Sequence, residues 1–313
     1  RVSEEAARQA SVKKVEADGY RFSSSIKDYG VLDSIFLHAS ERNELEPDQI
    51  EVQVKAAALN FRDIMVAMGL ISGEAIEGGL YGRHLGLEAC GIVSRIGANV
   101  RNFAVGDEVA GCAVNSLSGY VVGSQNHFVK KIDGLSHAQM AALPLVYLTA
   151  YYSFTRLAHV TRGEKVLIHA AAGGVGIAAI QIAKAMGAEV YATAGSNDKK
   201  EYLRALGVTH IYNSRSLHFA DEIMKDTGGN GVDVVLNALS GPSIYKSLRC
   251  LAPFGRFVEM GKTDIYRNSQ IGLKNFGNNI SYHVVDVDRM LKYKPVLAGE
   301  LLSETMQFFA DNS

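Results

Sequence analysis

The sequence predicts an α/β protein in two parts, a β-rich first part followed by a doubly wound parallel sheet. In the first part, up to about Leu143, residues 50–54 alternate between apolar and polar, and residues 91–97 read as a strand that ends in a turn. From Tyr147 onward, short apolar strands alternate with helical stretches. That alternation indicates right-handed βαβ crossovers and a parallel sheet.

The elements of the second part follow one another at short spacing. A helix starts near Pro144, and further helices are predicted at residues 176–186 and 199–206. Strands are predicted at residues 165–169, 190–193, 210–212, 232–236, 256–260 and 280–285. In the first part, residues 104–109 read as a turn that leads into a strand. The residues from Met290 onward are predicted to be helical, and because they are too few for a domain, we expect them to pack back on the first part.

Composition limits the class of protein. The chain has 313 residues, which suggests about two domains, and 32 Lys plus Arg against 33 Asp plus Glu give a net charge of −1. That balance gives no reason to expect nucleic-acid binding or a membrane surface. No apolar run approaches the roughly 20 residues of a membrane helix, and the charged start lacks the apolar core of a signal peptide. We expect a cytoplasmic protein, and the missing initiator methionine suggests a piece excised from a longer chain, or a processed one.

Several residues of reactive type are interpreted as structural. Cys90, Cys112 and Cys250 are far apart and odd in number, which argues against a disulfide framework and favours small buried thiols. His169 ends the first strand of the second part and enters a glycine loop, where a structural role is expected. Three tyrosines are expected to pack on the helix that starts near Pro144: Tyr147, Tyr151 and Tyr152.

A glycine-rich segment follows that first strand. Residues 170–176 read Ala-Ala-Ala-Gly-Gly-Val-Gly, a variant of the dinucleotide fingerprint with Ala at the first glycine position. Glycines there permit a tight turn and let backbone N–H groups approach a pyrophosphate, while the next helix N-terminus adds partial positive charge. We therefore predict that a dinucleotide binds at Gly173, Gly174, Val175 and Gly176.

The end of the second strand indicates which dinucleotide binds. A site for NAD would place Asp or Glu there to hold the ribose 2′-hydroxyl, but the strand tip carries no acid. Ser196 and Lys199, with Arg215 after the third strand, suit a 2′-phosphate, so we predict NADPH. Asp198 lies nearby but begins the next helix, where an acid suits the helix dipole. The alternative is that Lys199 and Arg215 are ordinary solvated charges.

Six motifs occur in a fixed order along the chain: Asn60-Phe61-Arg62-Asp63, residues 85–91, Leu143-Pro144 with residues 149–152, residues 169–176, Asn237-Ala238-Leu239, and residues 255–262. Together they resemble the enoyl reductase domain of polyketide synthases and animal fatty acid synthase, in the medium-chain dehydrogenase/reductase superfamily. The pattern is especially similar to iterative, mycocerosic-acid-type synthases. The resemblance spans about residues 30–288. It implies a Rossmann domain at residues 145–285, inserted in a GroES-like substrate domain formed by residues 1–144 and 286–313.

The resemblance implies an activity and partners. The expected reaction is NADPH-dependent reduction of the α,β-double bond of an enoyl thioester on an acyl carrier protein, with hydride to Cβ and a proton to Cα. Such an enzyme must position the cofactor, stabilise the oxyanion and deliver the proton. Neighbouring synthase domains are expected partners. Domains of this family occur as dimers and as monomers, so a homodimer is left open.

Lys262 is the leading catalytic candidate. It follows Gly261 at the carboxyl end of a predicted strand, the edge at which open parallel sheets bind ligands. Asp286 closes the next predicted strand at the same edge, where it can pair with Lys262, although Asp288 fits a longer strand. The resemblance assigns the same Lys–Asp pair to the active site.

The resemblance also implies further site residues, which are Thr149, Tyr212, Asn237 and Gly261 for the cofactor, and Asn60 and Ile71 for the substrate pocket. Some modular synthases carry a Tyr just after the segment that matches residues 67–69, and it is thought to donate the Cα proton. Leu70 and Ile71 stand there in this chain. Protonation from another group or from water is therefore implied.

No metal is expected. Zinc enzymes of the superfamily place a Cys ligand near residues 60–63, where this chain has none, and a Gly-His-Glu sequence where this chain has Gly86-Leu87-Glu88. The four-cysteine structural zinc lobe is absent as well. Hydride transfer to a conjugated alkene does not require a Lewis acid.

Two other functions are kept as alternatives. The first is a free-standing quinone or enone reductase of the same superfamily, whose cofactor site would look the same. The second is an NADPH-binding module without catalysis, which the glycine loop together with Lys262 argues against.

Overall fold

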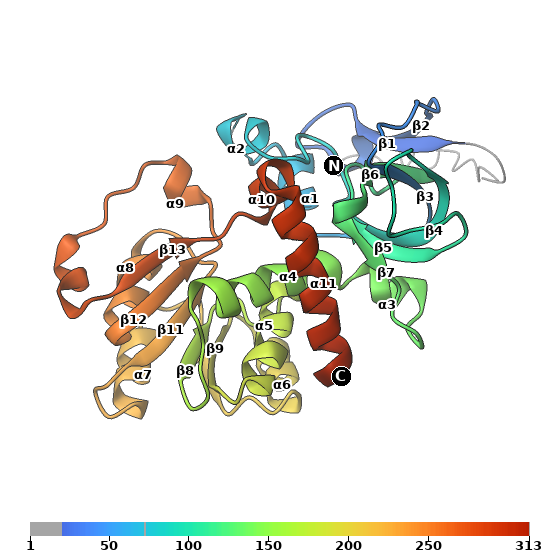
Figure 1. Cartoon of the computed structure of the whole chain (residues 1–313). Helices are drawn as coiled ribbons and strands as arrows, with labels where there is room; N and C mark the ends of the chain where they lie inside the picture. The colour runs from blue at the N-terminus through green and yellow to red at the C-terminus, as the bar shows by residue number, and fades with distance from the viewer. Residues whose placement is uncertain (1–20, 72, 313) are drawn as a thin grey trace.

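The computed structural model describes residues 21–71 and 73–312, which form three sheets (Figure 1). A two-stranded hairpin and a five-stranded antiparallel sheet belong to the first part of the chain. A six-stranded parallel sheet with helices belongs to the second part. The predicted α/β class, with a β-rich part followed by a parallel sheet, is confirmed.

The antiparallel sheet has the strand order β6-β3-β4-β5-β7. Its strands are β3 (Gln49–Ala58), β4 (Glu88–Ile96), β5 (Glu108–Cys112), β6 (Tyr120–Ser124) and β7 (Phe128–Lys130). Ile50 and Val52, two positions apart on β3, enter one buried cluster with Val93, Val109 and Phe128. The period-two pattern reflects this single buried face.

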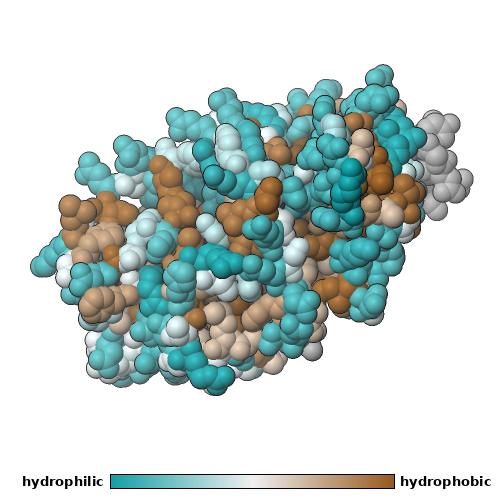
Figure 2. All heavy atoms as spheres, in the orientation of Figure 1, coloured by the Kyte–Doolittle hydropathy of each residue, from teal (hydrophilic) through white to brown (hydrophobic). Residues whose placement is uncertain are grey.

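Short elements surround the antiparallel sheet. The hairpin consists of β1 (Phe22–Ile26), the 3₁₀ turn η2 (Leu32–Ser34) and β2 (Ile35–Ala39). Between β3 and β4 lie α1 (Phe61–Ala67) and α2 (Gly73–Glu77), and η3 (Gln125–His127) and α3 (His137–Ala141) flank β7. The side chains of β2 are all exposed. Figure 2 shows apolar patches on a mostly hydrophilic surface, some of them toward the end of the molecule that carries this hairpin.

The parallel sheet has the strand order β10-β9-β8-β11-β12-β13. Its strands are β8 (Lys165–Ile168), β9 (Glu189–Ala194), β10 (His210–Asn213), β11 (Val232–Asn237), β12 (Leu251–Glu259) and β13 (Ser281–Val284). In chain order this is the 3-2-1-4-5-6 arrangement of the Rossmann fold, whose strand order reverses between β8 and β11. Ligands of such sheets bind at the carboxyl ends of the strands.

The helices of the second part are α4 (Pro144–Tyr152), continued by the π turn η4 (Ser153–Leu157), then α5 (Gly174–Ala185), α6 (Asn197–Ala205), α7 (Phe219–Asp226), α8 (Pro242–Arg249) and α9 (Thr263–Tyr266), with the 3₁₀ segment η5 (Leu273–Asn278). Helices α5 and α6 begin two residues before the predicted helices. Gly173 and Ser196 are their N-caps, and both types are favoured at that position.

Two C-terminal helices return to the first part, as expected. Helix α10 (Val287–Tyr293) places the Leu291 carbonyl 3.1 Å from Nε2 of His127. Helix α11 (Pro295–Asn312) packs on η3 and β7 of the first part and also on α4, where the Phe309 and Tyr147 rings meet edge to face with centroids 5.1 Å apart. The chain thus passes to the second part just before α4 and returns after β13. The domain boundaries at 144/145 and 285/286 stay predictions.

Candidate active site

A cavity of about 650 Å³ lies between the two parts of the molecule. One wall comes from α1, α2 and the turn between them, including Phe61, Leu70 and Ile71. The opposite wall comes from the loops after β11 and β12, including Gly261 and Lys262. The cavity therefore lies at the carboxyl ends of the parallel strands, where the fold predicts a ligand.

The predicted Lys262–Asp286 pair is present in the structure. The Lys262 ammonium nitrogen lies 2.7 Å from Oδ2 of Asp286, and the two side chains are 32% and 16% exposed. Asp286 is also the N-cap of α10, because its Oδ1 accepts the Arg289 N–H at 3.0 Å. Asp288 instead accepts hydrogen bonds from the backbone of Leu80 and Tyr81. Of the two alternatives, Asp286 is the partner of Lys262.

Sequence reasoning missed a buried carboxylate behind this pair. Glu259, the last residue of β12, is 1% exposed. Its carboxylate accepts hydrogen bonds from the Gly261 N–H at 2.6 Å, from Nδ2 of Asn237 at 2.7 Å and from the Tyr282 hydroxyl at 3.4 Å. Burial raises the pKa of Glu259 to about 7. Glu259 therefore fixes the turn that carries Lys262 to the end of β11.

A second buried carboxylate joins the two parts. Glu88 of β4 is 1% exposed, and its carboxylate accepts from Nδ2 of Asn60 at 2.9 Å and from the Leu145 N–H of α4 at 2.7 Å. Burial raises the pKa of Glu88 to about 7. The side-chain amide of Asn60, which was expected in the substrate pocket, therefore donates its hydrogen bond to Glu88. Ile71, the other residue expected there, lines the cavity.

The glycine loop has the shape that a pyrophosphate site needs. A side chain on Gly176 would place its Cβ only 2.5 Å from the Ala171 carbonyl oxygen, so only glycine fits there. Gly173 and Gly174 are exposed at the N-terminus of α5, and the N-cap, Gly173, has no side chain that could cap the helix. The first N–H groups of a helix are unpaired donors that suit a phosphate.

Ser196, Lys199 and Arg215 gather at the ends of β9 and β10. Ser196 caps α6, and the Arg215 side chain lies over Gly195, whose Cβ, if present, would be 3.0 Å from Nε of that arginine. Lys199 and Arg215 are exposed and make no ion pair within residues 21–71 and 73–312. The cluster has the positive charge that a 2′-phosphate requires.

Two family models match the chain: an alcohol dehydrogenase GroES-like domain over residues 46–144 and a zinc-binding dehydrogenase over residues 174–287. A mycocerosic acid synthase-like polyketide synthase of Mycolicibacterium smegmatis is 40% identical over 309 residues, 98% of this chain. A highly reducing polyketide synthase of Didymella fabae is 41% identical over 290 residues, 91% of this chain. The chain spans only 14% and 15% of the lengths of these two relatives.

Among solved structures, the CurK enoyl reductase is 40% identical with a TM-score of 0.84, and the match covers 93% of this chain and 89% of that one. The chain belongs to the enoyl reductase family of polyketide synthases. The apo JamJ enoyl reductase, at 33% identity and a TM-score of 0.85, has the same coverage. This enoyl reductase is therefore an oxidoreductase of the medium-chain dehydrogenase/reductase superfamily, whose members of this type use NADH or NADPH.

Other predicted residues have structural partners in this enoyl reductase. Tyr212 is 6% exposed and its hydroxyl donates to Asp226 at 2.7 Å, and the cofactor role that the resemblance implied stays a prediction. The Thr149 hydroxyl donates to the Leu145 carbonyl at 2.7 Å, one turn earlier in α4. His169 lies between two hydroxyls, and burial lowers its pKa to about 3, which agrees with a structural role.

The described residues bear on the expectation that no metal is bound. Within residues 21–71 and 73–312, no three His, Cys, Asp or Glu side chains are arranged to hold a metal ion. Cys90, Cys112 and Cys250 are free and buried, as expected. None of the helices in the described residues is long and apolar enough to cross a membrane. Independence from zinc stays a prediction.

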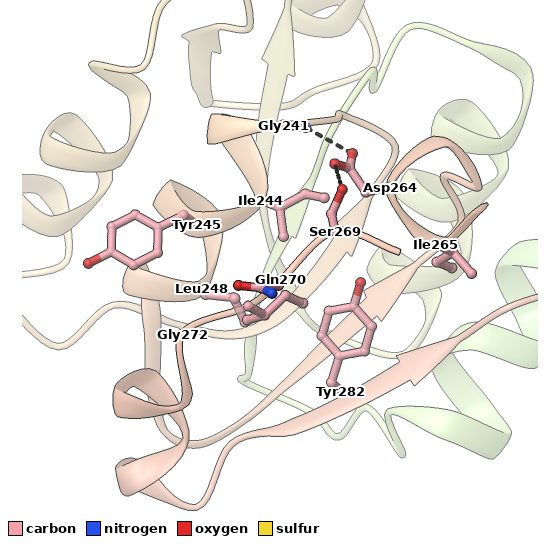
Figure 3. Close-up of a pocket in the computed structure, with 11 residues that line it drawn as sticks. Gly241, Ile244, Tyr245, Leu248, Asp264, Ile265, Ser269, Gln270, Gly272 and Tyr282 are labelled. Atoms are coloured by element: carbon pink, nitrogen blue, oxygen red, sulfur yellow. Dashed lines mark hydrogen bonds between the residues drawn. The ribbon is translucent and has the colours of Figure 1, made fainter. Parts of the chain in front are cut away.

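A smaller cavity of about 190 Å³ lies between α8 and the segment that follows α9 (Figure 3). Asp264 borders it and accepts hydrogen bonds from the Gly241 N–H and the Ser269 hydroxyl, both at 2.9 Å (Figure 3). None of the predicted site residues lines this cavity. The larger cavity beside Lys262 is therefore the candidate active site.

Proposed function

We propose that this enoyl reductase uses NADPH to reduce the α,β-double bond of an enoyl thioester presented by an acyl carrier protein. The observation that carries the proposal is the Lys262–Asp286 pair, held at the wall of the interdomain cavity and at the carboxyl edge of a Rossmann sheet. The relatives, which are multidomain synthases, support neighbouring synthase domains as partners. We also propose that the substrate is bound to a carrier protein, that the protein forms a homodimer and that it is located in the cytoplasm.

The residues present fit a phosphorylated dinucleotide. The free N-terminus of α5 with Gly173, Gly174 and Gly176 would hold the pyrophosphate, and Ser196, Lys199 and Arg215 would hold the 2′-phosphate. When bound, NADPH supplies the hydride that adds to Cβ of the substrate. The Glu259 carboxylate, by fixing Asn237 and Gly261, keeps the adjoining strand ends in place for the cofactor.

Lys262 supplies the charge that the reaction needs. Hydride addition at Cβ leaves negative charge on the thioester oxygen, and an ammonium group at the cavity wall stabilises such charge. The same ammonium group is a proton donor for Cα, and Asp286 fixes its position. Leu70 and Ile71 line the cavity where other synthases have a tyrosine. The Cα proton therefore comes from Lys262 or from water.

The deciding experiment is a turnover assay of the purified chain. Enoyl thioesters of graded length would be offered with NADPH or NADH, and a quinone and a simple enone would be offered in parallel. The proposal requires thioester turnover with NADPH preferred. Faster turnover of the quinone or enone would favour the free-standing reductase, and binding of NADPH without any turnover would favour the non-catalytic module.

A further inference from the structure

The first turn of α10 connects the two walls of the active-site cavity. Its residues Asp286 and Asp288 are two positions apart, and their carboxylates reach in different directions. Asp286 reaches Lys262 in the second part of the molecule, 2.7 Å away. Asp288 reaches the first part, where its Oδ1 accepts the backbone N–H of Leu80 at 2.5 Å and that of Tyr81 at 3.2 Å. Figure 1 shows α10 beside α1 and α2.

Two glycines let this turn approach the chain after α2. A Cβ on Gly79 would overlap Oδ2 of Asp288, and a Cβ on Gly78 would overlap the Arg289 guanidinium. Neither glycine has a positive φ, and the atoms that a Cβ would meet belong to the ends of the Asp288 and Arg289 side chains, so a substitution would have to displace those side chains. Lys292, one turn further along α10, donates to the Glu77 carbonyl at 3.2 Å. The contact between α10 and residues 77–81 is therefore continuous.

Asp288 is held by two backbone hydrogen bonds and by an ion pair. Its side chain is 8% exposed, and Oδ2 lies 3.7 Å from Nη2 of Arg62. Oδ2 of Asp288 and Nη1 of Arg62 are buried without a hydrogen-bond partner in the described residues. Both hydrogen bonds of this carboxylate are therefore made by Oδ1, and they fix the position of the turn.

We propose that Asp288 is a positioning residue, which fastens the first turn of α10 to residues 80–81 and thereby holds Asp286 on Lys262. The inference rests on the proposed function, because it takes Lys262 as the catalytic cation. Arg62, beside Asp288, lines the same cavity as Lys262. Asp288 thus sets the distance between the substrate-side wall and the Lys262–Asp286 pair, and an error of about 1 Å in such a distance can cost up to about a hundredfold in rate.

A double-mutant cycle tests the proposal. Asp288→Ala should lower kcat about tenfold and leave the Kd for NADPH unchanged, because the glycine loop and the 2′-phosphate cluster are remote in sequence and untouched. If Asp288 acts through Asp286, the Asp286→Ala/Asp288→Ala protein should have the kcat of the Asp286→Ala protein. Effects that multiply would overturn the proposal, as would an Asp288→Ala protein with the parental kcat.

Two further variants separate positioning from simple loss of stability. Gly79→Ala keeps Asp288 but displaces its carboxylate, and should reproduce the loss of kcat. Gly277→Ala in η5, away from the cavity, is the matched control, because no atom lies within 4 Å of its Cβ, and it should retain the parental kcat. Asp288→Asn retains an acceptor for Leu80 and Tyr81, and should recover most of the kcat lost in the alanine variant. Equal kcat in Gly79→Ala and Gly277→Ala would contradict the proposal.

Amide hydrogen exchange needs no substrate, so it tests this inference separately from the proposed function. In Asp288→Ala, the amide hydrogens of Arg289 and Met290, which bond to Asp286, should exchange with solvent faster than in the parent. In Gly277→Ala their exchange should be unchanged. Unaltered exchange in Asp288→Ala would show that Asp288 does not hold the turn, even if no thioester is reduced. Absence of thioester turnover in the parent would end the proposed function alone.

Discussion

Replacing Glu259 by Gln should change how the stability of the protein depends on pH. Burial raises the pKa of Glu259 from an ordinary 4.5 to about 7. A shift of that size corresponds to about 3 kcal/mol between the two protonation states, at about 1.4 kcal/mol for each unit of pKa. The glutamine cannot ionise. It also offers one oxygen to three donors, so at least one buried donor loses its partner, at a cost of about 1–3 kcal/mol that does not vary with pH.

The sign follows from the direction of the shift. The folded protein binds the Glu259 proton more tightly than the unfolded chain does, so this contribution to stability is fully present below pH 4.5. It is lost as the pH rises through about 7. Glu88 has the same shift and the same sign. His169 has the opposite effect on stability. Its pKa is lowered from 6.5 to about 3 in the folded protein, so stability rises with pH as the imidazole of the unfolded chain loses its proton. Only the difference between parent and variant isolates Glu259.

The assay is urea unfolding of the parent, of Glu259→Gln and of the exposed control Glu300→Gln, at intervals from pH 5 to pH 8.5. Between these limits the parent should lose about 3 kcal/mol more unfolding free energy than Glu259→Gln. The control should follow the parent. Parallel curves for the parent and Glu259→Gln would refute the reasoning, because they would mean that the three hydrogen bonds keep Glu259 ionised throughout.

Three further predictions concern the site. Lys262→Ala should lower kcat by about a hundredfold or less with little change in the Kd for NADPH, and its product made in deuterated water should show altered facial selectivity at Cα. A variant with the parental kcat and stereochemistry would remove Lys262 from the mechanism. Lys199→Ala should raise KM for NADPH by the equivalent of about 1–3 kcal/mol and leave KM for NADH nearly unchanged, whereas equal use of both cofactors by the parent would contradict the 2′-phosphate site. Activity should survive prolonged chelation, and loss of turnover that added zinc restores would show a missed metal site.

Patterns that depend on neighbours in the chain predicted the fold well. Alternation of strands and helices identified the parallel sheet, because its inner strands β8, β9 and β11 are short apolar runs that are largely buried and each crossover has a narrow range of lengths. The Lys262–Asp286 pair could be found for a related reason. Both residues follow consecutive strands, and the carboxyl ends of neighbouring parallel strands lie at one edge of the sheet.

Features that depend on distant contacts could not be predicted. Glu88 and Glu259 are acids on strands, and only the fold shows that each is buried with donors from two other segments. Tyr212 lies in a predicted strand, and only the fold shows that its hydroxyl donates to Asp226 of α7. The choice between Asp286 and Asp288 was decided by Leu80 and Tyr81, about 200 residues earlier, whose N–H groups bind Asp288.

The double passage of the chain between the two parts has a mechanical consequence. The second part is tethered at two places, just before α4 and just after β13. Two crossings of the chain restrict how the second part can turn relative to the first more than a single crossing would. The contacts of Glu88 with Leu145 and of Lys262 with Asp286 lie beside those two crossings. Any motion that separated the two parts there would have to break these contacts.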